Sequence, residues 1–121
     1  MRFMMLVRGP QNAGQPPAAL FGAIQKLGQE ATAKGAMIST GGLLPTAAGA
    51  RARISGRRIS VTDGPFSEAK EVIGGFAIYD VKSKEEAVEW TRRFLQVHID
   101  HWPGWEGEVE IRQMFEGPPG A

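Results

Sequence analysis

The order of apolar and polar residues along this chain predicts six strands and two helices. Short apolar runs and strict alternation are typical of strands. They occur at residues 3–8, 37–44, 50–54, 58–62, 72–81 and 108–115. Apolar side chains recur at helical spacing over residues 18–34 and again in the segment after Ser83. Pro17 suits the start of the first helix and Gly35 its end, while Ser83 and Glu86 form a capping box for the second.

Glycine marks the turns and irregularities of these strands. Ser55-Gly56 is the expected turn of a hairpin between strands 50–54 and 58–62. With that turn, Arg58 would lie opposite Arg53. Gly74-Gly75, inside the strand 72–81, predicts a bulge or a close approach of another backbone.

The elements therefore follow the order β-α-β, hairpin, β-α-β. Each helix connects two strands of one sheet, which predicts a ferredoxin-like α+β sandwich with a β-hairpin insertion. Two helices cover only one face of such a sheet, so a second copy of the chain is the simplest cover for the other face. We expect one domain over residues 1–116 and a flexible tail at 117–121.

Composition narrows the function classes without identifying one. The net charge of +1 and the lack of a recognition motif argue against nucleic-acid binding. No apolar run reaches the length of a membrane span, and the N-terminal segment is interpreted as a strand rather than a signal peptide. The chain has no cysteine, which excludes disulfides and thiol catalysis and fits a cytoplasmic protein.

The nine residues from Asp63 to Glu71 read DGPFSEAKE, and residues 74–81 read GGFAIYDV. Together they resemble the signature of YCII-related proteins of the DGPF type, and the resemblance covers nearly the whole chain. It implies a dimeric α/β barrel of ferredoxin-like subunits. Some relatives look like small-molecule enzymes, and members of the DGPF type are associated with extracytoplasmic-function sigma factors. The wider group carries a histidine on its first helix, paired with an aspartate, but residues 18–34 contain no histidine.

The loop that carries the signature is the first candidate site. Asp63 is either a general base or a turn residue that bonds to the backbone. Phe66 is expected to anchor the loop on the core. Glu68 and Lys70 either place a carboxylate and an amine over a pocket or lie on an exposed, salt-bridged edge.

Arginines of the hairpin form the second candidate site. Alternation places Arg51 and Arg53 on one face, with Arg58 beside them. Guanidinium groups that share a face suit a carboxylate or phosphate ligand. The alternative is a solvated hairpin with unpaired arginines.

Tyr79 and His98 are the remaining catalytic candidates. Tyr79 either donates to a ligand carbonyl or packs with its hydroxyl at the rim of the core. His98 continues the inward stripe of the second helix and is a candidate base. Its spacing to His101 also admits a metal site, although a third histidine is lacking, and a helix C-terminus favours cationic residues in any case.

These observations predict a cytoplasmic homodimer that binds a small anionic molecule between the helix-free sheet face and the loop 63–70. Trp102 and Trp105 would form an apolar flap over the pocket or a dimer contact, and the alternative is that they pack in the core. An enzymatic role would be isomerase or lyase chemistry by proton transfer, with neither metal nor cofactor. The alternative is a non-catalytic ligand sensor, or a partner of a regulatory protein such as a sigma factor.

Overall fold

The computed structural model of this chain describes residues 1–117, so most of the predicted tail, 118–121, lies outside the described residues. Its elements follow the predicted order. They are β1 (Arg2–Pro10), α1 (Ala18–Ala33), β2 (Met37–Gly42), the short 3-10 helix η1 (Thr46–Ala48), β3 (Ala50–Ser55), β4 (Arg58–Asp63), β5 (Glu71–Asp80), α2 (Lys84–His101) and β6 (Glu108–Gln113).

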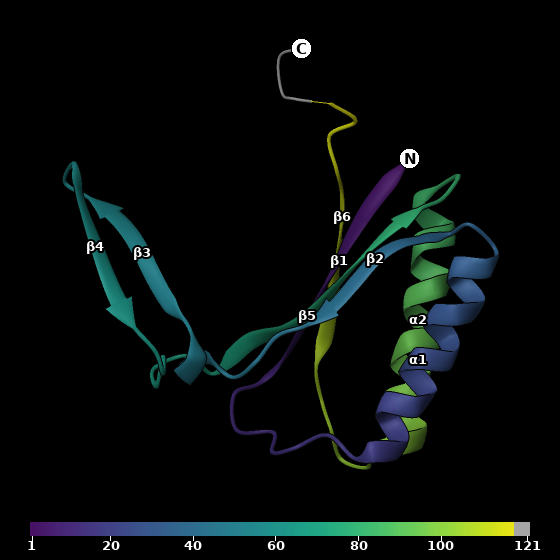
Figure 1. Cartoon of the computed structure of the whole chain (residues 1–121), viewed down its shortest axis with the longest axis horizontal. Coiled ribbons are helices and arrows are strands. Elements are labelled where there is room, and N and C mark those ends of the chain that lie inside the picture. The colour runs from purple at the N-terminus through teal and green to yellow at the C-terminus, as the bar shows by residue number, and fades with distance from the viewer. Residues whose placement is uncertain (118–121) are drawn as a thin grey trace.

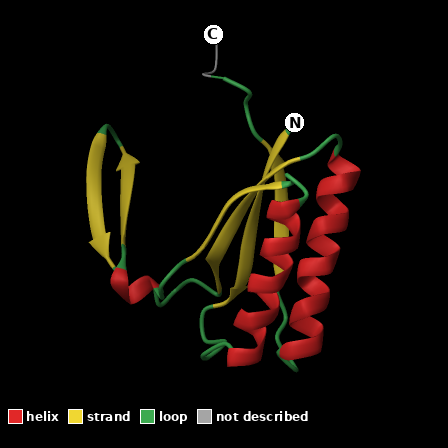
Figure 2. Cartoon of the chain, turned by 45° about the vertical axis from the view of Figure 1, so that its right-hand side comes forward, coloured by secondary structure: helices red, strands yellow, loops and turns green. Residues whose placement is uncertain are grey.

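Four of the strands form one antiparallel sheet in the order β2-β5-β1-β6, and β3 and β4 form a separate two-stranded sheet. Both helices lie on the same face of the four-stranded sheet (Figure 2). This is the ferredoxin-like α+β arrangement with a hairpin insertion, as the sequence predicts. The other face of the sheet carries no helix (Figures 1 and 2).

The core lies between the sheet and the two helices. Phe3 and Met5 from β1, Tyr79 from β5, Ala31 from α1 and Trp90 from α2 are all buried there. Alternation explains the strand contribution, because side chains two residues apart point to the same face. The helix-covered face is thus the apolar stripe that the sequence predicts.

The predicted ends of both helices are confirmed. Pro17 is the N-cap residue of α1, and Gly35 follows its last turn with φ +72°. The Ser83 hydroxyl accepts a hydrogen bond from the Glu86 amide at 3.1 Å, as in a capping box. The Glu86 carboxylate accepts from the Lys82 amide, not the Ser83 amide. Within residues 1–117, neither helix has the length and hydrophobicity that crossing a membrane requires.

Gly74 and Gly75 produce both of the predicted irregularities. Val7 pairs with Gly75 and Arg8 with Ile73, so Gly74 is the extra residue of a β-bulge. A Cβ on Gly75 would lie 3.0 Å from the Gly41 carbonyl oxygen of the neighbouring strand. The missing side chain therefore lets β2 and β5 approach closely.

The hairpin turns one residue later than predicted. Its turn is Gly56-Arg57, and both residues have positive φ, +57° and +66°. Two positive φ values suit a two-residue turn that matches the twist of the strands, so Ser55 ends β3 instead of opening the turn. Arg58 consequently pairs with Ser55, and Arg53 pairs with Ser60. The prediction that Arg53 and Arg58 face each other directly is wrong, although both remain on one face of the hairpin.

We call residues 50–63 the arm, because this hairpin stands away from the rest of the fold (Figures 1 and 2). One face of the arm is basic and polar, with Arg51, Arg53 and Arg58. The other face carries Ile54, Ile59 and Val61, which are 76%, 75% and 67% exposed. Nothing in the described chain covers this apolar face.

Candidate functional site

The main cavity of the molecule lies on the helix-covered side of the four-stranded sheet and has a volume of about 540 Å³. Its wall includes Val7 from β1, Leu27 from α1, Tyr79 from β5, His98 from α2 and Val109 from β6. The loops after β1 and β2 extend the wall. This cavity is distinct from the predicted site between the helix-free face and the loop 63–70, because no residue of that loop lines it.

Glycines let neighbouring groups approach closely around the cavity. Gly9, Gly41 and Gly75 on the strands and Gly28 on α1 all line it. A Cβ on Gly9 would lie 3.0 Å from the Trp105 ring, and a Cβ on Gly41 would lie 2.9 Å from the Phe76 ring. The missing side chains therefore make room for these aromatic rings, a role that the glycine pattern in the sequence does not reveal.

His98 is the most distinctive polar group of the cavity. The side chain is 6% exposed, and its Nδ1 lies 2.9 Å from the Phe94 carbonyl oxygen. A carbonyl oxygen only accepts, so the hydrogen bond assigns the proton to Nδ1 and the lone pair of the neutral ring to Nε2. Burial lowers the pKa of His98 below its ordinary 6.5, against the opposing effect of the Phe94 hydrogen bond. The ring is therefore neutral at physiological pH, with a basic nitrogen.

Aromatic rings hold this histidine in place. The Phe94 and Trp105 ring centroids each lie 4.6 Å from that of His98, and Trp102 stacks on Trp105 at 5.8 Å. Both tryptophans line the cavity, as does Phe94. The segment 102–105 thus lies where the predicted flap over a pocket would be.

Tyr79 also lines the cavity, but at its buried end. Its ring packs against Trp90 with centroids 5.9 Å apart. Burial raises the pKa of the Tyr79 hydroxyl, which the positive charge of Arg93 partly offsets. A neutral hydroxyl can donate a hydrogen bond, but it is a poor base at neutral pH.

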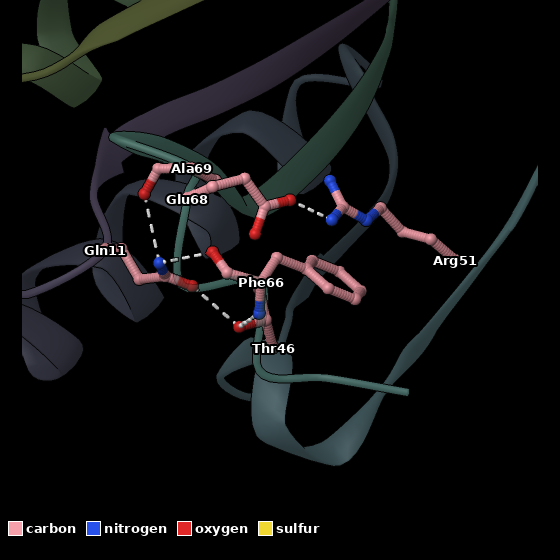
Figure 3. Close-up of polar contacts among 6 residues, drawn as sticks. All are labelled: Gln11, Thr46, Arg51, Phe66, Glu68 and Ala69. Carbon is pink, nitrogen blue, oxygen red and sulfur yellow. Dashed lines mark hydrogen bonds and ion pairs between the residues drawn. The ribbon is translucent and has the colours of Figure 1, made fainter. Parts of the chain in front are cut away.

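The loop 63–70 has a different role, because it attaches the arm to the body through Gln11 (Figure 3). The Gln11 side-chain amide donates to the Phe66 and Ala69 carbonyl oxygens at 2.8 and 3.0 Å. The Thr46 hydroxyl donates to the Gln11 side-chain oxygen at 2.7 Å and accepts from the Phe66 amide at 3.2 Å. Three segments distant in sequence thus meet at one side chain. Gln11 lies between the predicted strand 3–8 and the predicted helix 18–34, and the sequence gives no sign of this role.

The signature residues of this loop fit a structural role. A Cβ on Gly64 would lie 1.6 Å from the Thr46 carbonyl oxygen, so only glycine fits there. Phe66 lies under the guanidinium of Arg51, at 4.1 Å from ring centroid to Cζ. Arg51 also forms an ion pair with Glu68 (Figure 3), and this hydrogen bond lowers the pKa of the Glu68 carboxyl. The carboxylate expected near the arginines is therefore supplied by the chain itself.

The structure divides the predicted site residues into three groups. Tyr79 and His98 line the main cavity. Arg51, Phe66 and Glu68 form the contact between the arm and the loop. The others lie on the surface, namely Arg53 and Arg58 on the arm, Asp63 at its base, and Lys70 beside a second hollow of about 360 Å³ with Glu71 and Glu108.

The proposed metal ligands do not form a cluster. Over residues 1–117, no three histidine or carboxylate side chains come close enough together to hold a metal ion. His98 lies in the cavity wall, whereas His101 does not line it. The i, i+3 spacing therefore places one histidine inward and leaves the other outside the cavity.

Comparison with known proteins gives a family match over most of the chain. A family model described as the YCII-related domain matches residues 1–113. An uncharacterized protein of Rhizobium meliloti (strain 1021) is 39% identical over 78 residues, which is 64% of this chain and 59% of that protein. The matched part thus spans little more than half of that relative's length.

Proposed function

This chain belongs to the YCII-related family, and we propose that it binds a small, neutral and largely apolar molecule in the cavity beside His98. One observation carries the proposal. Among the described residues that line the cavity, His98 is the only one that titrates near neutral pH, and its Nε2 lone pair is free of protein hydrogen bonds within residues 1–117. A convergent polar group in an apolar pocket is typical of small-molecule sites.

The lining argues against the anionic ligand that the arginines suggested. Apolar side chains such as Phe21, Ile24 and Leu27 dominate the wall, and its described part contains no lysine, arginine or carboxylate. An anion placed there would lose its hydration without gaining a charged partner. A planar apolar molecule with one hydrogen-bond donor fits better, because it can contact Trp105 and donate to His98.

Nε2 can also act as a base. It would accept a proton from an oxygen or an activated carbon of the bound molecule and return it at another position, which is isomerisation without a cofactor. A receptor and an isomerase built on this site differ only in whether that proton moves. Tyr79, neutral and at the buried end of the cavity, would supply a hydrogen bond in either case.

The proposal is tested by calorimetric titration with 1-naphthol, which is planar, apolar and carries one hydroxyl donor. We expect His98→Phe to weaken binding about tenfold, since a hydrogen bond of about 1.4 kcal/mol is lost while the apolar volume is kept. Binding should be constant near pH 7 and weaken as the pH falls below 6.5, where protonation consumes the lone pair.

His101→Phe is the matched control, because it changes the same residue type on the same helix outside the cavity wall. It should leave the affinity for 1-naphthol unchanged. The anion 1-naphthoate should bind more weakly than 1-naphthol. The proposal fails if the wild-type protein does not bind 1-naphthol, or if both histidine variants bind it equally well.

We further propose that the protein is a cytoplasmic homodimer in which a second copy covers the helix-free face of the sheet. That face carries a patch of half-buried apolar side chains. Met4 lies opposite Ile78 and Leu6 opposite Phe76. Beside this patch, Arg8 donates to Glu110 at 3.0 Å, and Arg112 pairs with the same carboxylate. Apolar surface framed by ion pairs is typical of an interface with a polar rim; a monomer in sedimentation equilibrium would contradict the proposal.

A further inference from the structure

We propose that the apolar face of the arm packs against a second copy of this chain, so that the hairpin of each subunit contacts the other subunit. The inference goes beyond the dimer proposed above, because it assigns to the interface a segment outside the four-stranded sheet. It is independent of whether the cavity binds a ligand.

The surface chemistry of the arm is that of a strand pair with one covered face. Ile54 and Ile59 lie directly opposite each other, and Val61 continues the same face. These three β-branched side chains are 67–76% exposed. The opposite face carries Arg53, Arg58 and other polar residues. Antiparallel sheets with one packed and one solvated face show this alternation, yet no part of the described chain covers the apolar face of the arm.

An isolated two-stranded hairpin is marginally stable in water, so this arm needs support at both ends. Contacts with the body support the arm at its base. Arg51 is held by Glu68 and Phe66, and the Gly64 amide donates to the Gly49 carbonyl oxygen at 2.8 Å. The base is therefore fixed to the body, while the hairpin of β3 and β4 stands away from it (Figures 1 and 2).

The direction of the arm fits a second copy as the occupant, and this step rests on the dimer proposed above. The helices lie on one side of the four-stranded sheet, and the arm projects on the other side in both views (Figures 1 and 2). A copy that covers the helix-free face would therefore lie within reach of the arm. A twofold axis would bring the second arm back onto the first subunit, which closes the assembly.

Interface area supports the same conclusion. A stable interface buries about 800 Å² on each partner. Among the described residues, Ile54, Ile59 and Val61 are highly exposed apolar side chains, and they would add to the apolar surface of the helix-free face. Both surfaces together would fit one dimer.

The absence of cysteine makes a direct test possible, since any introduced thiol is unique. The variants are Ile59→Cys on the apolar face and Ser60→Cys, its neighbour on the polar face. Each is labelled with a maleimide over a range of protein concentrations, and sedimentation equilibrium gives the mass of the same samples. We expect labelling of Ile59→Cys to slow about tenfold once the protein is about a hundredfold above the dimer dissociation constant. Labelling of Ser60→Cys should stay constant.

The pair Val61→Cys and Thr62→Cys repeats the comparison one step along β4 and should give the same contrast. Equal labelling on both faces at every concentration would overturn the inference, even where sedimentation shows a dimer, and would leave the sheet-face dimer standing. Slow labelling at Ile59→Cys that does not depend on concentration would also overturn it, because the arm would then pack within its own chain. No ligand is present, so these outcomes are separate from those of the 1-naphthol titration.

Discussion

Strands β4 and β6 have nearly the same pattern and very different surroundings. Each has six residues, alternates apolar with polar, and places a valine and an isoleucine on one face. Val109 and Ile111 of β6 pack against the core under the helices. Ile59 and Val61 of β4 are 75% and 67% exposed. The difference lies in their neighbours, because β6 joins a four-stranded sheet at β1 and β4 pairs only with β3.

The comparison shows what alternation can and cannot encode. It determines which side chains share a face, because the period of a strand is two. It does not determine what covers that face. For β6 the cover comes from the same chain, and for β4 we assign it to a second copy.

The largest effect is expected at the junction between the arm and the body. Gly64→Ala places a Cβ 1.6 Å from the Thr46 carbonyl oxygen, so the backbone of one segment must move. We expect a loss of about 2–3 kcal/mol in the free energy of unfolding, because hydrogen bonds between Gln11, Thr46 and Phe66 depend on that fit. Urea denaturation measures it.

Gly74→Ala is the matched control for that substitution. No atom lies within 4 Å of the Cβ position on Gly74, and its φ is not positive. Its stability should change by less than about 0.5 kcal/mol. Equal losses in both variants would show that the loop does not depend on the close approach at Gly64.

The same reasoning explains which parts of the fold and of the candidate site can be predicted from the sequence. Apolar spacing, the capping box at Ser83 and the glycine pair in β5 predict the sandwich and its bulge, because each depends on local chemistry. The hairpin turn was displaced by one residue, since Arg57 adopts a positive φ that side-chain chemistry does not favour. His98 lies in the cavity wall, which agrees with its place on the inward stripe of the second helix. The cavity on the helix-covered side is not predicted from the sequence, because its wall combines residues of several elements that meet only in the fold.

The signature loop, residues 63–71, also differs from what its sequence pattern indicates. Its charged residues resemble a catalytic cluster in the sequence, yet Glu68 pairs with Arg51 and lies outside the cavity. Gln11 organises the same loop from a position more than fifty residues earlier in the chain. Contacts between distant segments are not encoded in local patterns, so neither fact was predictable from the motif.

A smaller effect on stability is expected for the same substitution in β6 and in β4. Ile111→Ala removes apolar contacts with the core, and we expect a loss of about 1–2 kcal/mol in the free energy of unfolding. Ile59→Ala is the same substitution at an exposed site and should cost less than about 0.5 kcal/mol in dilute monomer. At concentrations that favour the dimer, Ile59→Ala should lower the free energy of unfolding by more than it does in dilute solution. An equal cost of both substitutions in dilute solution would contradict the contrast between body and arm.

The smallest effect concerns ion pairs, one in the body and one at the base of the arm. Arg93 of α2 forms a two-pronged pair with Glu30 of α1, and this hydrogen bond lowers the pKa of Glu30 from its ordinary 4.5 to about 2. A lowered carboxyl pKa adds stability above the unfolded value, and that stability is lost as the pH falls from about 4.5 toward 2. Because the pair is exposed, solvent screens it and the effect should be small.

Glu30→Gln should therefore lower the unfolding midpoint slightly at pH 7, and its difference from the wild-type protein should shrink between pH 4.5 and 2. Glu89→Gln is the control, because Glu89 pairs with Arg92 within α2 and does not link the two helices. Added salt should remove most of the Glu30 effect. Parallel pH profiles for Glu30→Gln and wild type would show that this pair adds nothing to the body. The packing of α1 and α2 over the sheet would then be sufficient by itself, and lack of such cover would be the whole difference between body and arm.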